Sequence, residues 1–301
     1  MRNYNDIAQK FANGCPVRSV KRFGSGNIND TFIVEFESEI ANPYILQKIN
    51  TNVFKQPKLI MENMRTIIDH ITSRIKSENQ TQHQWKIPQV LRSEDGLDYY
   101  QDDHLSFWRA ITFIPHSKTY DKLEKPHHAH EAGYALGKFH ELLSDLNVST
   151  LHDTLIGFHI APDYLKKFDL VLNQTTCDLD CEITRYCTQA IQQRRQSIDI
   201  LEKAKTKGIL KERPIHGDPK LANILFHQSE EHTLGIIDLD SVKPGLVHYD
   251  IGDCLRSCCN LLGEDTQSFD KITFNLTICP TEEESIFNLV PKYGPSNGTL
   301  I

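Results

Sequence analysis

The residues best suited to chemistry lie in a short run near position 220. His216 and Asp218 are two residues apart, and Asn223 lies five residues beyond the aspartate. This spacing suits a loop that holds a general base beside a metal ligand. Asp238 follows fifteen residues after Asn223, at the end of an apolar run with the length of a tight two-stranded hairpin. We therefore expect the hairpin to return this carboxylate to the loop.

A second run of interest is the segment Gly24-Ser25-Gly26-Asn27, between two strand-like stretches. Two glycines this close allow a backbone to pass over phosphate groups and point its N–H groups at them. Position 29, where a third glycine would be expected, carries Asn29, a residue type that tolerates positive φ better than most. We predict that the four residues 24 to 27 contact a nucleotide. The alternative is an ordinary hairpin turn.

The strand expected at residues 44 to 50 carries a lysine where a kinase has its phosphate-binding lysine. Successive side chains of a strand point to opposite faces, so Gln47 and Lys48 cannot both face a nucleotide. We predict Lys48 because of its charge; the alternative is a solvated strand lysine. Glu62, in the helix expected at residues 57 to 76, either pairs with this lysine or is one more exposed glutamate.

The pattern of apolar residues divides the chain into a sheet-rich part and a helical part. Pro115 interrupts the strand pattern, because proline removes a ladder donor. We predict an α+β fold of two lobes: a nucleotide-binding lobe with an antiparallel sheet and one main helix (1–113), a hinge (114–118), and a mostly helical lobe with the catalytic loop and acceptor site (119–301). The expected strands are residues 87–91, 97–101, 107–113, 224–227 and 234–238, and the expected helices are one within 1–22, then 57–76, 131–146, 162–173, 181–206 and one opening near 247 with Asp250 as its cap.

Composition excludes some classes of partner. The 301 residues include 33 Lys and Arg against 40 Asp and Glu, a formal charge of -7, so no broad cationic surface is expected for nucleic acid or anionic lipid. The polar start and the lack of a long apolar stretch predict neither a signal peptide nor a membrane span, and we expect a cytoplasmic protein. The eight cysteines lack zinc-finger spacing, which favours free thiols.

With these residues assembled, the chain resembles the aminoglycoside phosphotransferase-like kinases, a family that also contains choline and homoserine kinases. The likeness runs from about residue 20 to about residue 275 and implies a protein-kinase-like fold that uses ATP and Mg²⁺. Within the family the chain is most similar to the N-acetylhexosamine 1-kinases. The matched motifs are His216-Gly217-Asp218-x-x-x-x-Asn223, Ile237-Asp238-x-Asp240, Gly26-Asn27-Ile28-Asn29-x-Thr31, Tyr44-Ile45-Leu46-Gln47, Lys220, and Gly252-Asp253-x-x-Arg256.

The resemblance gives each motif residue a task in phosphoryl transfer, where an enzyme mainly positions the reactants and screens charge. Asp218 is expected to accept the proton of the acceptor hydroxyl, and Lys220 to neutralise the transferring phosphate. Asn223 and Asp238 are expected to hold Mg²⁺. His216 is expected to support the loop by hydrogen bonding. Asp240 either orients the lysine or completes the metal shell.

The leading acceptor implied by the resemblance is the anomeric hydroxyl of an N-acetylhexosamine or related sugar. Other small hydroxyl acceptors remain alternatives: an aminoglycoside, choline or ethanolamine, or homoserine. A catalytically silent nucleotide-binding protein is a further alternative. A protein kinase is disfavoured, because neither an activation-loop segment nor an Ala-Pro-Glu stretch follows Asp240.

The end of the chain departs from the family pattern. Relatives continue with helices that complete the acceptor pocket, whereas this sequence becomes rich in proline and glycine after about Ile278. The departure predicts an incomplete acceptor pocket, as in a truncated or frameshifted member. A segment of this composition is also expected to fray.

Overall fold

The computed structural model describes residues 4–24, 26, 28–77, 85–174, 181–264, 266, 268 and 271–275. The chain divides into two compact units. One contains the residues before 155 together with those from 213 onward, and the other contains residues 155–212. The predicted tail after residue 278, and the frayed end expected there, lie outside the described residues.

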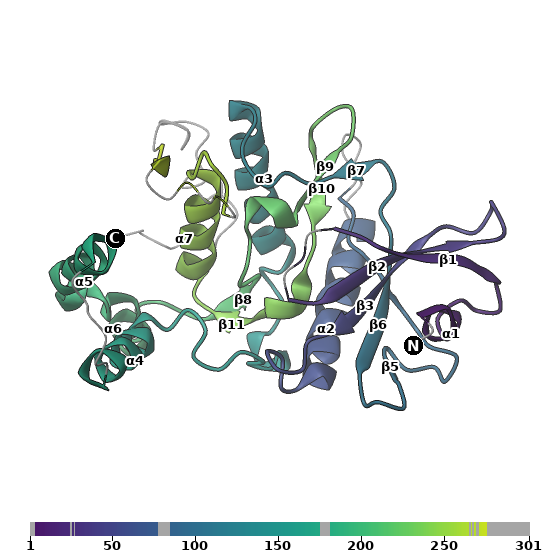
Figure 1. Ribbon diagram of the computed structural model, residues 1–301, viewed down its shortest axis with the longest axis horizontal. Helices are drawn as coiled ribbons and strands as arrows, with labels where there is room; N and C mark the ends of the chain where they lie inside the picture. Colours follow the sequence, from purple (N-terminus) through teal and green to yellow (C-terminus); the bar gives the residue numbers. More distant parts are fainter. Residues whose placement is uncertain are drawn as a thin grey trace. The chain divides into compact units, whose positions relative to one another are not determined.

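The first unit contains an antiparallel sheet in the order β1-β2-β3-β6-β4, and β5 also pairs with β6. Strands β2, β3 and β6 lie side by side through the whole register, with Thr31 opposite Gln47 and Gln47 opposite Arg109 (Figure 1). The predicted sheet-rich part of an α+β fold is therefore confirmed. The strands are β1 (Val17–Arg22), β2 (Asp30–Phe36), β3 (Tyr44–Ile49), β4 (Val90–Leu91), β5 (Tyr100–Gln101) and β6 (Phe107–Thr112).

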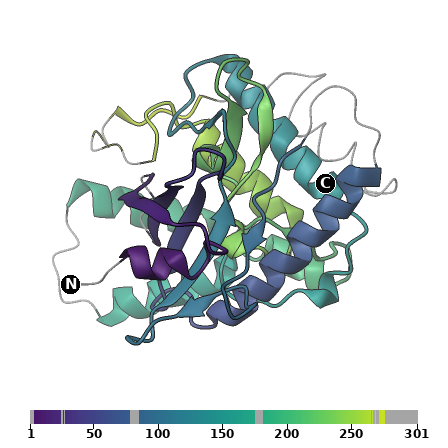
Figure 2. The ribbon, with the colours of Figure 1, turned by 90° about the vertical axis from the view of Figure 1, so that its right-hand side faces the viewer.

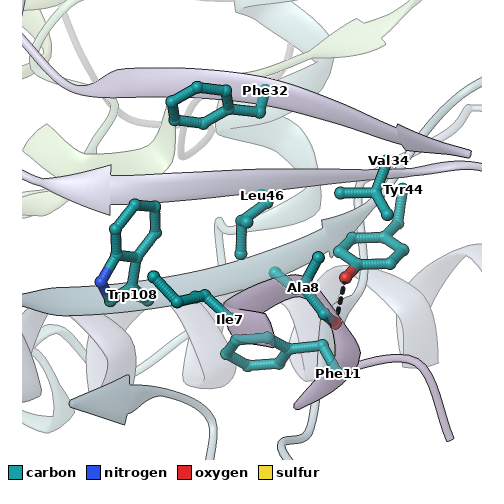
Figure 3. Close-up of a cluster of buried hydrophobic side chains, with 9 residues drawn as sticks. Ile7, Ala8, Phe11, Phe32, Val34, Tyr44, Leu46 and Trp108 are labelled. Carbon is teal, nitrogen blue, oxygen red and sulfur yellow. Dashed lines mark hydrogen bonds between the residues drawn. The ribbon is translucent and has the colours of Figure 1, made fainter. Parts of the chain in front are cut away.

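One face of this sheet is closed by α1 (Tyr4–Gln9) and the residues just after it. In Figure 3, side chains from α1 point at the sheet residues Leu46 and Trp108, and the Tyr44 hydroxyl donates a 2.5 Å hydrogen bond to the Ala8 carbonyl. Successive side chains of a strand point to opposite faces of a sheet. The strand residues on the face that α1 covers pack there as an apolar cluster. The cluster comprises Ile7, Ala8, Phe11, Phe32, Val34, Tyr44, Leu46, Trp108 and Ala110.

Helix α2 (Pro57–Ser77) lies on the opposite side of the sheet and confirms the helix expected at residues 57 to 76. Figure 2 shows this long helix running diagonally past the sheet. Asn63 of this helix is buried, and its side chain both donates and accepts hydrogen bonds. Its amide nitrogen donates to the carbonyls of His152 and Val242 at 2.8 and 3.0 Å. Its oxygen accepts the His152 N–H at 2.8 Å. The helix is thereby tied to later segments of the chain.

The remainder of the first unit holds two more small sheets and two helices. Strands β10, β9 and β7 pair in that order, and β8 pairs with β11, all antiparallel. Helix α3 starts five residues before the predicted position and buries one apolar face that includes Ala132, Leu136 and Phe139. These elements are α3 (Pro126–Leu142), α7 (Val247–Cys258), β7 (Ser117–Lys118), β8 (Arg213–Ile215), β9 (Ile224–His227), β10 (Thr233–Ile236), β11 (Lys243–Gly245), and the 3-10 turns η1 (Val148–Thr150), η3 (Leu221–Asn223) and η4 (Leu239–Ser241).

The second unit is helical. The prediction of a single helix at residues 181 to 206 is wrong, because a 3-10 turn separates two helices there. At that turn the Arg195 side chain donates two hydrogen bonds to the Asp169 carboxylate, at 2.7 and 2.8 Å. The elements are α4 (Ala161–Gln174), α5 (Glu182–Arg194), η2 (Arg195–Ser197) and α6 (Ile200–Thr206). No described helix combines the length and the apolar character that a membrane crossing needs.

Gly235 in β10 generates a stability prediction. A Cβ atom built there would lie 2.0 Å from the Lys86 carbonyl oxygen, and the Lys86 N–H donates to the neighbouring Leu234 carbonyl at 2.7 Å. Backbone cannot yield as a flexible side chain can, so Gly235→Ala is expected to lower the free energy of unfolding by about 1–3 kcal/mol. Denaturant titration measures this change in the free energy of unfolding.

Gly252 is the matched control. It lies in α7, and a Cβ atom there meets nothing within 4 Å. Gly252→Ala is expected to leave stability unchanged or raise it by up to about 1 kcal/mol, since alanine is the better helix former. Equal effects of the two substitutions would contradict the packing argument.

Candidate active site

The loop between β8 and η3 is held by a buried carboxylate. Asp250 accepts the backbone N–H groups of His216 and Gly217 at 2.7 and 2.8 Å. Burial opposes its charge, but the His140 side chain, 3.0 Å away, helps keep the pKa of Asp250 below its ordinary value. The prediction that Asp250 caps α7 is wrong: the cap position is Leu246, and Asp250 lies in the first helical turn. Its carboxylate stabilises the loop rather than the helix end.

His216 supports the loop without facing the cavity. The side chain is fully buried, and burial lowers its pKa, so the imidazole is neutral. Its Nε2 lies 2.9 Å from the Ile237 carbonyl oxygen, and its Nδ1 accepts the Asp218 N–H at 3.3 Å. The next residue, Gly217, has φ +82°, and a Cβ atom there would lie 2.6 Å from the Ser241 carbonyl oxygen. Only glycine suits this crossing of two backbones.

Asp218, Lys220 and Asn223 come together as their spacing predicts. The Lys220 ammonium lies 3.2 Å from Asp218 Oδ2, and the Asn223 amide donates to the Asp218 carbonyl at 2.8 Å and to Oδ2 at 3.1 Å. Burial acts against the lysine charge, yet the Asp218 carboxylate raises the pKa of Lys220 above its usual value. With its amide group donating to Asp218, Asn223 keeps its side-chain oxygen as an acceptor for a further ligand.

The β9–β10 hairpin returns Asp238 to this loop, as the sequence predicts. Strands β9 and β10 pair antiparallel with a register shift between Thr233 and Gly235, and beyond them the Ile237 N–H donates to the Asn223 carbonyl at 2.8 Å. Asp238 itself has φ +65°, an unfavourable conformation of the kind that gathers at functional sites. Although its side chain opens onto the cavity, burial among protein atoms and the negative charge of Asp240 raise the pKa of Asp238 to about 7.

The site also contains a network that the sequence did not predict. Arg109 in β6 forms an ion pair with Asp240, and the two side chains are only 1% and 2% exposed. Arg109 also donates two hydrogen bonds to Gln47 Oε1, at 2.7 and 2.9 Å, and Asn29 donates to Asp240 Oδ2 at 2.7 Å. The sequence feature that could have indicated this network is one arginine within a mostly apolar strand, Phe107–Thr112. The second aspartate of the motif therefore orients an arginine, not Lys220.

Lys48 does not line the cavity, and this corrects the choice between the two strand residues. Gln47 lies on the cavity face together with Thr31 and Arg109, whereas Lys48 belongs to the face that carries Leu46 and is covered by α1. Alternation along the strand makes the two placements mutually exclusive. Glu62 does not pair with the lysine in the structure; its carboxylate lies 3.0 Å from His152 Nε2.

These groups surround one cavity of about 460 Å³, a size ordinary for a small-molecule site. Gly24, Gly26 and Asn29 line it from the glycine-containing turn, and Asp218 and Lys220 from the catalytic loop. The other predicted loop residues, Ser25 and Asn27, lie outside the described residues. The lining also includes Thr31, Gln47, Arg109, Asn223, Asp238 and Asp240.

The oxygen donors in the cavity fit a magnesium ion. Mg²⁺ prefers carboxylate and amide oxygens and few protein ligands, and Asp238 and the side-chain oxygen of Asn223 are such donors. Burial, and after it the negative charges of Asp240 and Asp218, raise the pKa of Asp238. A divalent cation bound there would favour the charged carboxylate. The two residues predicted as metal ligands are thus compatible with the role.

The sheet, the turn over the cavity and the loop with a base, a lysine and an amide together define a protein-kinase-like phosphotransferase. Comparison with known proteins agrees. The profile of the phosphotransferase enzyme family (APH) matches residues 19–269, more than half of the chain. The chain belongs to this family, and the prediction of a phosphotransferase enzyme is confirmed.

Solved structures support the same fold. A structure of the GDP and kanamycin complex of APH(2″)-IIIa is 16% identical, with TM-score 0.59 over 96% of this chain and 82% of that chain. A microcompartment-associated aminopropanol kinase is 18% identical, with TM-score 0.58 over 83% and 73%. A spectinomycin phosphotransferase in complex with ADP and spectinomycin is 16% identical, with TM-score 0.51 over 79% and 68%. At these identities the likeness establishes the fold and leaves the acceptor open.

The buried ion pair generates a prediction about stability. Arg109→Met leaves the Asp240 carboxylate without its buried partner, so the free energy of unfolding is expected to fall by about 3–5 kcal/mol. Lys48→Met, on the neighbouring strand but on the other face, is the matched control, with an expected change within about 0.5 kcal/mol. Denaturant unfolding of both variants provides the measurement. A larger loss for Lys48→Met than for Arg109→Met would reverse the assignment of the two faces.

Proposed function

We propose that this chain transfers the γ-phosphate of ATP to a hydroxyl group of a small molecule. The observation that carries the proposal is the contact of Asp218 with both Lys220 and Asn223 on the wall of a cavity lined on another side by Gly24 and Gly26. In this proposal residues 1–113 form the nucleotide-binding lobe, 114–118 the hinge and 119–301 the acceptor lobe.

The reaction follows from the positions of the side chains. Asp218 accepts the proton of the acceptor hydroxyl as that oxygen attacks the γ-phosphorus, since a positioned carboxylate is an effective base at short range. The bond between the γ-phosphorus and the β,γ-bridging oxygen breaks, and ADP leaves with that oxygen. Lys220, kept charged by its 3.2 Å contact with Asp218 Oδ2, lies beside the transferring group and offsets its negative charge. Asn223 and Asp238 would hold Mg²⁺, which would supply positive charge to offset that of the nucleotide phosphates.

The nucleotide phosphates pass close to Gly24 and Gly26, and we retain Ser25 and Asn27 in the same role on the sequence argument. Lys48 has no part in this proposal. Gln47 takes its place on the cavity face, held by hydrogen bonds from Arg109 and to Thr31. The Arg109 guanidinium supplies a positive charge near the place where a kinase has its strand lysine, although its N–H groups already serve Gln47 and Asp240.

The leading acceptor is the anomeric hydroxyl of an N-acetylhexosamine or related sugar, which rests on the motif resemblance. A cationic acceptor, an amino alcohol or an aminoglycoside, is the second candidate. The observation in its favour is that Asp121 and Glu264 also line the cavity, where carboxylates would attract an ammonium group. The names of the similar structures, which include a kanamycin complex and an aminopropanol kinase, point the same way.

Asp218→Asn tests the base directly. The substitution keeps the size and hydrogen-bonding shape of the side chain but removes its ability to take a proton. Turnover is expected to fall by about three orders of magnitude or more, with Mg-ATP binding nearly unchanged. Steady-state kinetics and a nucleotide-binding titration give the two readouts. A variant that keeps more than about a tenth of the wild-type rate would exclude Asp218 from this role.

An acceptor panel tests the function as a whole. Mg-ATP is incubated with the protein and, separately, amino sugars, hexoses, choline, ethanolamine, homoserine and aminoglycosides, and ADP release is measured against an acceptor-free control. The expected result is acceptor-dependent ADP with amino sugars. ADP with a cationic acceptor alone would select the second candidate. Thermal stabilisation by Mg-ATP without ADP from any acceptor would identify a silent nucleotide-binding protein.

A further inference from the structure

Two histidines and a glutamate meet on the first turns of α3, and none of them lines the cavity described above. Glu131 Oε1 lies 3.8 Å from His127 Nε2 and 3.7 Å from His130 Nδ1. All three candidate ligand atoms lie within 4.8 Å of one another. His130 and Glu131 lie three and four residues after His127, spacings that bring side chains onto one face of a helix. His130 and Glu131 are adjacent in sequence, so their 3.7 Å approach is a feature of the structure and not of the spacing.

Glu131 is held in place from its other side. It is 12% exposed, and its Oε2 accepts the backbone N–H of Thr233 at 2.6 Å, while the Thr233 hydroxyl donates to the Glu131 carbonyl at 2.9 Å. One carboxylate oxygen is thus fixed by β10 and the other faces the two imidazoles. A ligand carboxylate oriented by a hydrogen bond to its second oxygen is the usual arrangement in metal sites.

The distances fit a small metal ion. In a tetrahedral shell with bonds of about 2.0–2.1 Å, neighbouring ligand atoms are about 3.3–3.4 Å apart, a few tenths of an ångström less than the two separations between Glu131 Oε1 and the imidazole nitrogens. His127 is about half exposed and His130 somewhat less so, so an ion can reach both from solvent. Imidazole nitrogens with one carboxylate suit Zn²⁺, Cu²⁺ or Ni²⁺ rather than Mg²⁺.

We propose that His127, His130 and Glu131 form a binding site for a divalent transition metal ion, with Zn²⁺ as the test ion. Water would complete the coordination. The cysteine spacing that favours free thiols has no bearing on histidines along a helix. The simpler reading is a group of solvated surface histidines, and the fixed carboxylate of Glu131 is the observation that argues against it.

A second group of the same composition provides an internal comparison. His227, Glu230 and His232, at the β9–β10 turn, also have ligand atoms within 4.8 Å. There the Glu230 side chain is 65% exposed, and His227 Nδ1 already accepts the Glu230 N–H at 3.2 Å. This group has the same residue types without a fixed carboxylate, so we expect it to bind the ion more weakly.

The proposed site also has a mechanical consequence. Glu131 joins α3 to Thr233, the first residue of β10, and β10 leads to Asp238 at the cavity. An ion bound to α3 would therefore stabilise the junction that carries this strand, because a ligand that binds only the folded state raises its stability. We expect a higher unfolding temperature with Zn²⁺, with no requirement for ATP or an acceptor.

The experiment titrates untagged protein with Zn²⁺ by calorimetry, in excess Mg²⁺ so that oxygen-rich sites such as the active-site carboxylates are occupied. His127→Ala/His130→Ala is compared with the matched His227→Ala/His232→Ala. The expected result is that the first variant loses at least about tenfold in affinity, together with the Zn²⁺-dependent rise in unfolding temperature, while the second keeps both. Glu131→Gln, which preserves an oxygen for the Thr233 N–H, should also weaken binding by about tenfold or more.

Either of two results would overturn the proposal. One is that both double variants bind Zn²⁺ as the unaltered protein does, which would mean adsorption at scattered histidines. The other is that only His227→Ala/His232→Ala loses binding, which would assign the ion to the hairpin. Folding of each variant without metal is verified by its unfolding temperature.

Discussion

The buried ion pair between Arg109 and Asp240 is the interaction on which the site depends. It connects β6 of the sheet with the turn η4 that follows Asp238, so the sheet side and the loop side of the cavity share one contact. Neither charge is exposed, and an unpaired charge at this depth would be costly. Gln47 and Asn29 satisfy the remaining groups of the pair, so the two parts of the site are fixed relative to each other.

A second buried carboxylate, that of Asp250, holds the backbone of the loop in place. Asp250 binds two successive backbone N–H groups, and the tight conformation of Gly217 allows the loop to pass within contact of Ser241. Asp218 thus projects from a backbone fixed on both sides. Around it Lys220 offsets the charge of the Asp218 carboxylate, while burial and the neighbouring Asp240 raise the pKa of Asp238.

Much of this was predictable, and the errors have identifiable causes. The spacing of His216, Asp218 and Asn223 predicted a loop that the structure contains, because the contacts among these three residues are local in sequence. The predicted strand of residues 44 to 50 was also found, but its facing was wrong, because charge was weighed above the burial of the face that carries Lys48. The helix at 181 to 206 was predicted unbroken, because the pairing of Arg195 with a distant aspartate leaves no periodic signal.

The sequence predicted the family through its resemblance to known members, the α+β class through apolar periodicity, and the loop from His216 to Asn223 through residue spacing, and it also allowed that the Asp250 carboxylate holds this loop. Only the tertiary structure showed which side of β3 faces the cavity, what Asp240 binds, and that Arg109 belongs to the site. Each of these depends on a contact between residues far apart in the chain, such as the one between Arg109 and Asp240. Such contacts exist only once the sheet and the loop are packed together, so no local pattern can encode them.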